Sequence, residues 1–383
     1  MVSDLLNPIS AIQHDSPWEY YARLTRETPV YFDSDLKLWV VSDAASVDAV
    51  LGSPVLQVRP ASQPVPPGLV GQPAGDVFGQ LVRMREGEYQ QQLKAVIIRA
   101  FSTIDSAQVS HLARQLAQQS LSDGEEINNW LFSVPAAVVA TLCGFLPRDV
   151  PEVVALIAEF VLCIPAAAGP EHQQRASLAA RSLLERFSAQ IAQAPQGSLL
   201  TELLRCAGEE GWSQRAPLIA NAIGFLSQTF DATASLAGNT LLTVQRYPDL
   251  WQCGPADTFI DETARYTSPI QNTRRFAVHE VTLLGQRIAL DDTILLMLAA
   301  ANRDPARFAR PDVFQLQRNT QAYFSFSGGR HRCPGAAVAR AITHGMLSAL
   351  DAYMPGWHQR LYKHRYLPSG NARIPEFSLS EIN

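Results

Sequence analysis

A cysteine in a glycine-rich turn is the clearest candidate for chemistry in this chain of 383 residues. The segment 324–340 reads FSFSGGRHRCPGAAVAR and places Cys333 between Gly329 and Gly335, just before an alanine run typical of a helix. Glycines allow a tight turn and leave room beside the sulfur for a bulky group. Backbone N–H groups in such a turn and a following helix N-terminus favour the thiolate, a soft and strongly donating ligand. The alternative is a structural cysteine buried ahead of a helix.

The composition narrows the classes of protein that could use such a ligand. A hydrophobic content of 47% is enough to bury a large core, and a net charge of −5 gives no basic excess for nucleic acid. The five cysteines are widely separated and form no C-x-x-C pair, which argues against a disulfide framework or a tetrahedral zinc site. No apolar run reaches the roughly 18 residues of a membrane span, and the N-terminus lacks the layout of a secretion signal. We expect a cytoplasmic protein with no nucleic-acid or membrane partner.

The pattern along the chain predicts a mainly helical fold with a minor β-sheet region. Helical patterns cover 85–101, 106–122, 134–146 and 214–247, and strand patterns cover 28–41 and 268–298. Ser42 or Asp43 is expected to cap a helix after the first strands. Residues 53–80 are dense in proline and glycine and are predicted to be a long loop, of the kind that forms a binding lid or a disordered segment. The helix over 214–247, at ~1.5 Å per residue, would be on the order of 45 Å long and would cross a whole domain. With no linker or repeat, we expect one domain over 1–383.

The spacing around Cys333 follows F-x-x-G-x-H-x-C-x-G and resembles the haem-binding signature of the cytochrome P450 family of haem-thiolate enzymes. Glu262 and Arg265 in DETAR are similar to the family's E-x-x-R, and Arg318 lies where a further arginine completes that buried charge network. The resemblance covers nearly the whole chain. It implies the cytochrome P450 fold, with haem between a long distal helix, here 214–247, and a Cys-bearing proximal loop. Glu262 and Arg265 would then be structural and would anchor the region that positions this loop.

The same resemblance implies haem b, iron protoporphyrin IX, as the cofactor, with Cys333 as the axial iron ligand. The positions that match haem contacts of the family are Phe326, His331, Cys333, Gly335, Arg275, Lys94 and Gln90. Phe326 would shield the sulfur. Where the family often has a histidine and an arginine four residues apart, this chain has Gln90 and Lys94. Of the two side chains that would bind the haem carboxylates, Gln90 is therefore uncharged. Lys94 carries a point charge and cannot make the paired hydrogen bonds of an arginine.

The predicted distal helix departs from the family's A-G-x-D/E-T pattern. The matching residues are Gln228, Thr229, Phe230, Asp231 and Ala232, so the acid is kept and the hydroxyl is not. Thr233 points about 100° away on a helix, whereas Thr229 shares the face of Ala232. We interpret Asp231, Thr229 and Gln228 as catalytic residues, with Thr229 or Gln228 donating toward dioxygen and Asp231 linked to a proton-carrying water chain. A hydroxyl of the substrate is the alternative donor.

Substrate contacts follow only from position in the family. They are predicted within 65–77, at residues 225 and 228–231, and within 270–272 and 369–371. From these we name Phe225, Phe230, Ile270, Asn272 and Gly370. Gln228, Asp231 and Asn272 among the predicted contacts suggest a pocket that offers polar groups as well as apolar surface.

The function implied by the resemblance is a monooxygenase that activates dioxygen to hydroxylate or otherwise oxidise a small organic molecule, a secondary-metabolite intermediate that is free or bound to a carrier protein. The alternatives are a peroxide-driven enzyme, a haem-thiolate enzyme of coupling, desaturation or isomerisation, and a non-catalytic haem sensor. No flavin or nicotinamide domain fits in the chain, so electrons would come from a separate ferredoxin or flavodoxin type donor docking near Arg330 and Arg332. We expect a monomer.

Overall fold

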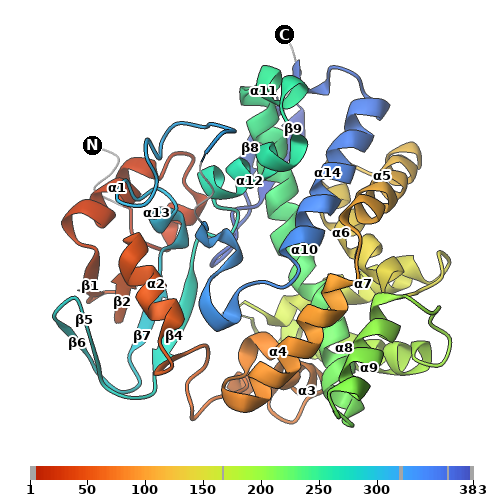
Figure 1. Ribbon diagram of the computed structural model, residues 1–383, viewed down its shortest axis with the longest axis horizontal. Coiled ribbons are helices and arrows are strands. Elements are labelled where there is room, and N and C mark those ends of the chain that lie inside the picture. Colours follow the sequence, from red (N-terminus) through yellow and green to blue (C-terminus); the bar gives the residue numbers. More distant parts are fainter. Residues whose placement is uncertain (1–5, 166–167, 319–321, 360–361, 380–383) are drawn as a thin grey trace. The chain divides into compact units, whose positions relative to one another are not determined.

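Helices make up most of the chain, and the described strands form three small sheets, which confirms the predicted fold class (Figure 1). The computed structural model describes residues 6–165, 168–318, 322–359 and 362–379. The chain divides into a first unit of residues 1–60, 235–333 and 354–383, and a second unit of residues 61–234 and 334–353. The single domain expected over 1–383 stays a prediction.

A five-stranded sheet organises the first unit. Its strands are β1 (Val30–Asp33), β2 (Leu38–Val41), β3 (Leu56–Gln57), β4 (Thr273–Ala277) and β7 (Thr293–Leu296), in the spatial order β1-β2-β7-β4-β3. β2 and β7 pair in parallel, and the other pairs are antiparallel. Because side chains alternate between the faces of a strand, Trp39 and Val41 pack in one apolar cluster with helix α2 (Ala44–Gly52), while Leu38 and Val40 pack in another with α1 (Trp18–Glu27). Both faces of β2 are therefore covered, and its whole length is buried.

The other elements of the first unit are η2 (Ser10–Gln13), α11 (Pro248–Cys253), α12 (Ala256–Thr267), the hairpin β5 (Val281–Leu283) and β6 (Gln286–Ile288), α13 (Leu298–Ala301), η6 (Phe324–Phe326), η7 (Gly329–His331), η8 (Trp357–Gln359), and the hairpin β8 (Tyr362–Tyr366) and β9 (Pro375–Leu379). Asp43 caps α2, since its side chain accepts a hydrogen bond from the backbone N–H of Ser46 at 2.9 Å. The strand prediction over 268–298 is confirmed, and the chain turns at Gly285 with a positive φ.

The second unit is helical. Its elements are η3 (Pro67–Leu69), α3 (Pro73–Gln80), η4 (Val82–Met84), α4 (Gly87–Ser102), α5 (Ser106–Ser122), α6 (Ile127–Leu142), α7 (Val150–Phe160), η5 (Val161–Cys163), α8 (Pro170–Gln190), α9 (Leu199–Glu209) and α14 (Ala336–Tyr353). α14 packs along α5, and the two helices lie side by side in Figure 1. At Gly345 of α14 a Cβ would lie 2.3 Å from the backbone carbonyl oxygen of Ser110, so only glycine permits this close approach.

The long helix predicted over 214–247 is α10, Arg215–Arg246, whose first part belongs to the second unit and whose last part belongs to the first. Several buried polar side chains lie on it. Asn221 accepts a hydrogen bond from the backbone N–H of Val82 at 2.9 Å and donates to the carbonyls of Gln80 and Pro217, both at 2.8 Å. Among the described helices, none combines the length and apolar character needed to span a membrane.

The prediction of a long loop over 53–80 is wrong in part. The segment contains β3, η3 and the two-turn helix α3, in which Pro73 occupies the first turn, where its missing N–H costs nothing. Val77 and Phe78 of α3 are buried. The proline and glycine content masked this helix, which packs against α8.

Candidate active site

The cysteine loop, residues 324–333, contains the two short 3₁₀ turns η6 and η7. The backbone N–H of Cys333 donates to the carbonyl of Phe326 at 2.9 Å, so the loop closes on itself. Gly329 has a φ of +58°, and a Cβ at this position would lie 2.5 Å from the carbonyl oxygen of Leu51. Conformation and space therefore both require glycine. The loop ends with Cys333 exposed.

Asn302 attaches the start of the cysteine loop to the rest of the first unit. Its Oδ1 accepts from the backbone N–H of Phe324 at 2.6 Å, and its Nδ2 donates to the hydroxyl of Ser325 at 3.0 Å. Ser325 in turn donates to the carbonyl of Ala264 in α12 at 2.5 Å. Asn302 and Ser325 are both buried, which strengthens these hydrogen bonds. The loop is thereby tied to α12.

Arg330 attaches the other half of the loop. Its guanidinium donates to the carbonyl of Ser53 at 2.8 Å and to that of Leu56 at 3.2 Å, just beyond the end of α2. Arg332 is exposed. Of the two arginines expected to carry charge near the loop, Arg330 therefore also holds the loop in place.

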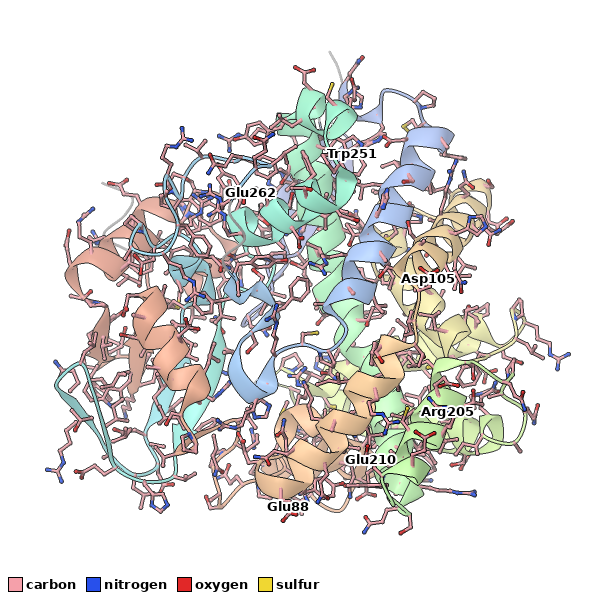
Figure 2. The ribbon with its side chains drawn as sticks, viewed as in Figure 1. Glu88, Asp105, Arg205, Glu210, Trp251 and Glu262 are labelled. Carbon is pink, nitrogen blue, oxygen red and sulfur yellow. The ribbon has the colours of Figure 1, made fainter. Side chains whose placement is uncertain are left out.

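Glu262 and Arg265 form a buried bidentate ion pair on α12, on which Figure 2 labels Glu262. The two hydrogen bonds measure 2.7 and 2.9 Å, and the side chains are 5% and 1% exposed. Arg318 donates to both carboxylate oxygens of Glu262 at 3.2 and 3.3 Å. Burial, followed by the nearby charge of Arg265, lowers the pKa of Arg318. The structure thus brings together the three residues that the sequence predicted as one network.

This network reaches the cysteine loop through Asn302. Arg265 donates to the backbone carbonyl of Asn302 at 2.9 Å, while the side chain of Asn302 holds Phe324 and Ser325. Arg265 also donates to the carbonyl of Pro311 at 3.0 Å. A continuous series of hydrogen bonds therefore runs from the charge network to the loop that ends in Cys333.

The predicted carboxylate-binding side chains lie on both units. In the first, Arg275 of β4 is buried and donates to the carbonyl of Arg274 at 2.8 Å, and His331 is half-buried in η7. In the second, Gln90 and Lys94 lie one turn apart on α4, the former buried and the latter half-buried. Their spacing places both on one face of α4.

The catalytic candidates lie near the middle of α10. The amide of Gln228 donates to the carbonyl of Gly224 in its own helix at 2.8 Å. Thr229 is half-buried and Thr233 is buried. Asp231 is accessible, yet the surrounding protein atoms restrict hydration of its carboxylate and raise its pKa. A carboxyl whose pKa is raised takes up and releases a proton more readily near neutral pH than an ordinary aspartate.

The other cysteines differ from Cys333 in accessibility. Burial raises the pKa of Cys143 to about 12 and that of Cys163 to about 11, so both are thiols at neutral pH. Cys206 is buried, and Cys253 is exposed at the end of α11. Cys333 alone among the five is exposed at the end of a loop closed by its own backbone hydrogen bond.

The two aromatic substrate candidates on α10 pack against other helices of the second unit. Phe225 makes an edge-to-face contact with Phe101 of α4 at 4.9 Å between ring centroids, and Phe230 contacts Phe132 of α6 at 5.2 Å. Phe225 is buried, whereas Phe230 is half-buried. Core packing therefore accounts for much of the surface of Phe225.

The other three substrate candidates lie together on two adjoining turns of the first unit. Ile270 forms an isolated β-bridge with Ala372, and the amide of Asn272 donates to the carbonyl of Gly370 at 3.0 Å. Sequence reasoning placed both turns near substrate but did not predict that they bind each other.

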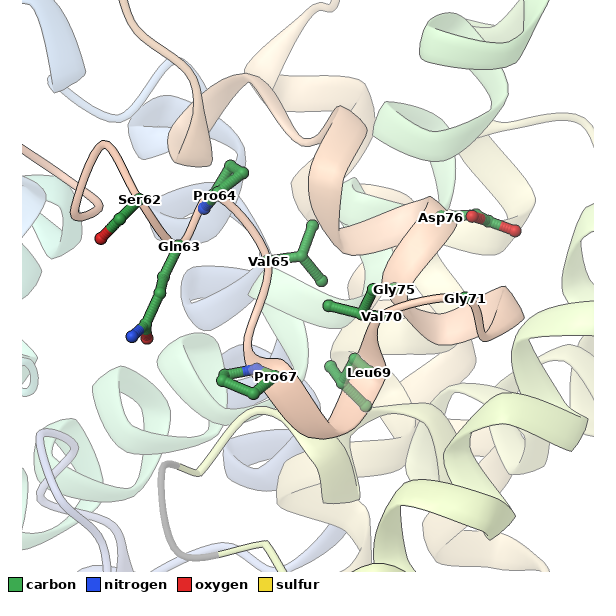
Figure 3. Close-up of a pocket in the computed structure, with 10 residues that line it drawn as sticks. All are labelled: Ser62, Gln63, Pro64, Val65, Pro67, Leu69, Val70, Gly71, Gly75 and Asp76. Carbon is green, nitrogen blue, oxygen red and sulfur yellow. The ribbon is translucent and has the colours of Figure 1, made fainter.

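A surface cavity of about 330 Å³ lies in the second unit, and Figure 3 shows its lining. The wall is formed by Ser62, Gln63, Pro64, Val65, Pro67, Leu69, Val70, Gly71, Gly75 and Asp76. Most of these residues fall within the predicted substrate-contact segment 65–77. The lining is largely apolar, with an amide, a hydroxyl and a carboxylate at its margin.

Three comparisons with known proteins bear on this site. A family model described as Cytochrome P450 matches residues 246–350. The biotin biosynthesis cytochrome P450 of Bacillus subtilis (strain 168) is 25% identical over 372 residues, which are 92% of this chain and 93% of the relative. The 20-oxo-5-O-mycaminosyltylactone 23-monooxygenase of Streptomyces fradiae is 25% identical over 363 residues, which are 91% and 85%. The crystal structure of P450BioI in complex with hexadec-9Z-enoic acid ligated acyl carrier protein has a TM-score of 0.81 and 23% identity, covering 94% of this chain and 97% of that chain.

The matched segment contains the charge network and the cysteine loop, and the fold agrees along almost the whole chain. The chain belongs to the cytochrome P450 family. The resemblance inferred from the spacing around Cys333 is confirmed, as is the predicted fold. This cytochrome P450 is an oxidoreductase of the monooxygenase type, and the family's cofactor is haem iron.

The residues present fit a haem group in the chemistry of their donors. Cys333 offers an accessible sulfur on a loop fixed at both ends, which suits a thiolate ligand for iron. Arg275 and His331 offer cationic or hydrogen-bonding groups within the same unit for the carboxylates of a porphyrin. The buried thiols Cys143 and Cys163 lack this accessibility.

Sequence reasoning missed Asn302 and Ser325, which connect the charge network of this cytochrome P450 to its cysteine loop. Neither residue carries a signal in the sequence, since asparagine and serine are common in irregular segments. Their role depends on partners far away along the chain.

Proposed function

We propose that this cytochrome P450 oxidises a small organic molecule, an intermediate of secondary metabolism, with Cys333 as the residue whose sulfur would hold the iron of haem b. The observation that carries the proposal is the exposed sulfur of Cys333 on a loop that buried hydrogen bonds tie to the Glu262–Arg265 pair. When bound, the haem would supply the activation of dioxygen and the transfer of one oxygen atom to the substrate. The side chains of the protein would bind the haem, orient the substrate and control the supply of protons.

On the cysteine side, Phe326 would exclude water from the sulfur, and Gly335 would leave space beside it. The guanidinium of Arg275 and the imidazole of His331 would bind the carboxylates of the haem. Lys94 and Gln90 of α4 would bind them as well, the former as a charge and the latter as a neutral hydrogen-bond donor.

On the distal helix, the Asp231 carboxyl would hold and pass on protons, which its raised pKa supports. Thr229 would provide a hydroxyl toward dioxygen in place of the one that Ala232 lacks, since both lie on the same face of α10. The amide of Gln228 already donates to Gly224, which favours Thr229 over Gln228 for this role.

Electrons would come from a separate ferredoxin or flavodoxin type donor. Arg332 is exposed beside Cys333, so its positive charge would favour an acidic partner. Arg330 carries the same charge while it holds the loop.

The names of two relatives support a substrate class for this proposal. P450BioI was crystallised with an acyl chain attached to acyl carrier protein, and the Streptomyces relative is named for oxidation of a glycosylated lactone. We infer that the substrate here is an acyl-type intermediate, either free or attached to a carrier protein.

The test is a spectroscopic titration of the purified holoprotein. The ferrous carbon monoxide spectrum reports thiolate ligation, and the Soret band reports displacement of water by a bound substrate. Free acyl compounds and the same groups loaded on carrier proteins are compared. A high-spin shift with either supports the proposal, whereas a holoprotein without the thiolate spectrum contradicts it.

The absence of a hydroxyl at Ala232 favours a second candidate, a peroxide-driven or non-hydroxylating haem-thiolate enzyme. The Thr229→Ala and Asp231→Asn variants separate the two, because a protein proton relay predicts less product per reduced cofactor in each. Unchanged coupling in both variants, together with turnover supported by hydrogen peroxide, would establish the second candidate.

A further inference from the structure

Two buried polar side chains on the last part of α10 bind segments outside the helix. The hydroxyl of Ser235 lies 3.0 Å from the carbonyl of Pro269 and 2.7 Å from that of Arg373, and the amide of Asn239 donates to the same Arg373 carbonyl at 2.6 Å. Ser235 and Asn239 are 0% and 1% exposed. They lie one turn apart and therefore share a face of α10.

Other buried hydroxyls of α10 behave differently. Ser227 donates to the carbonyl of Gly224, Thr240 to that of Leu236, and Thr243 to that of Asn239, so all three bind their own helix. Hydroxyls in helices commonly make such bonds. Ser235 instead binds two segments that lie 34 and 138 residues away in the chain.

The two segments held by Ser235 and Asn239 also bind each other. The backbone N–H of Arg373 donates to the carbonyl of Pro269 at 2.9 Å, and the N–H of Gln271 donates to the carbonyl of Asn371 at 2.7 Å. Together with the Asn272 to Gly370 hydrogen bond, these contacts join residues 269–272 and 370–373 into one body, which we call the paired turns.

The paired turns are fastened on a second side to the N-terminal segment. The guanidinium of Arg373 donates to the carbonyls of Ile12, His14 and Asp15 at 2.7 to 3.0 Å. The hydroxyl of Tyr21 donates to the side-chain oxygen of Gln271 at 2.8 Å. The paired turns therefore have two buried attachments, one to α10 and one to the N-terminal segment.

We propose that Ser235 and Asn239 are positioning residues that set the placement of the paired turns against α10 and thereby the ligand selectivity of the enzyme. The inference rests on the proposed function, in which Ile270, Asn272 and Gly370 of the paired turns contact substrate. The single proton of the Ser235 hydroxyl is shared between two carbonyls, and the Asn239 amide donates to one of them, so a shift of the turns weakens these contacts together and leaves buried polar groups with fewer partners. Ligands large enough to touch the turns depend on this placement, whereas small ligands of the iron do not.

The experiment uses the full-length holoprotein with two probes, imidazole and clotrimazole, each titrated by the Soret shift. Imidazole is small and binds haem iron, whereas clotrimazole carries three aryl rings that extend well beyond the iron. The variants are Ser235→Ala, Asn239→Ala and the double variant. Ser227→Ala is the matched control, because it removes a buried hydroxyl of the same helix that binds only that helix.

For Ser235→Ala we expect clotrimazole binding to weaken about three- to tenfold, the change that the loss of one buried hydrogen bond produces. The dissociation constant of imidazole stays within about twofold, and the control retains both affinities. The double variant weakens clotrimazole binding by less than the product of the single effects, since both residues share the Arg373 carbonyl. Hydrogen exchange of residues 268–273 and 367–374 becomes faster in the variants than in the control.

Equal loss of both ligands, or no change in the ratio of their affinities, would overturn the positioning role while the thiolate spectrum upholds the proposed function. If the wild-type holoprotein lacks the thiolate spectrum, the proposed function is wrong. In that case, hydrogen exchange that is unchanged between Ser235→Ala and Ser227→Ala overturns the placement of the turns as well.

Discussion

Replacing Glu262 by alanine removes the carboxylate that Arg265 and Arg318 share while leaving both arginines in place. Arg265, at 1% exposure, would lose its two hydrogen bonds of 2.7 and 2.9 Å and would keep backbone carbonyls and aromatic rings, none of which carries a negative charge. Arg318 would lose its contacts of 3.2 and 3.3 Å. The result is a buried, uncompensated guanidinium beside a second cation.

The expected loss of stability is about 3–5 kcal/mol, because removing one partner of a buried ion pair leaves the other charge desolvated without its counter-charge. Domains are typically stable by only about 5–15 kcal/mol, so the change takes a large part of the total. The loss spreads to the cysteine loop, since Arg265 holds the backbone of Asn302 and Asn302 holds Phe324 and Ser325.

The assay combines chemical denaturation with the haem content of the purified protein. The control is Glu280→Ala, which breaks the exposed pair of Glu280 with Arg287 on the β5–β6 hairpin. Exposed pairs contribute about 0–1 kcal/mol, so this variant should retain stability and haem. We expect Glu262→Ala to be recovered with little haem. A Glu262→Ala protein as stable and as haem-loaded as Glu280→Ala would refute the reasoning.

Three further predictions test the site. Cys333→Ser should abolish the thiolate spectrum of the ferrous carbon monoxide complex, whereas Cys253→Ser, at the other exposed cysteine, should retain it; loss in both would point to general damage. Gly329→Ala should prevent haem loading because its Cβ would meet a backbone carbonyl at 2.5 Å, whereas Gly211→Ala, with a similar positive φ and open space, should cost only about 1 kcal/mol in denaturation; equal effects would contradict this. The raised pKa of Asp231 makes the folded state bind more protons than the unfolded state above the ordinary aspartate pKa, so its contribution to stability falls as pH rises through that window. Asp231→Asn should therefore be more stable than wild type at neutral pH and equal to it in acid, and denaturation curves with no such pH-dependent difference would exclude the raised pKa.

Local patterns predicted much of the architecture. The lack of an internal proline beyond Pro217 and the proline at position 248 predicted α10 within one residue at each end, and the strand pattern over 28–41 predicted β1 and β2. The density of proline and glycine in 53–80 predicted a loop where α3 forms, because a proline such as Pro73 is compatible with the first turn of a helix. α3 also packs against α8, and no local sequence pattern reveals this tertiary contact.

The sequence by itself determined the family, through two local patterns. The spacing around Cys333 and the separation of Glu262 from Arg265 are local, so a short stretch carries each of them completely. The roles still proposed for the haem and substrate contacts depend on a bound cofactor and a ligand, which no spacing supplies.

Only the tertiary structure decided how these residues are held. Asn302 reaches Phe324 and Arg265, and Ser235 reaches Pro269 and Arg373, over separations of 22 to 138 residues. A buried serine or asparagine must find a hydrogen-bond partner, but the sequence does not say which carbonyl the fold will bring to it. Such contacts exist only after the helices and turns have packed, and for that reason the supports of the site became visible only in three dimensions.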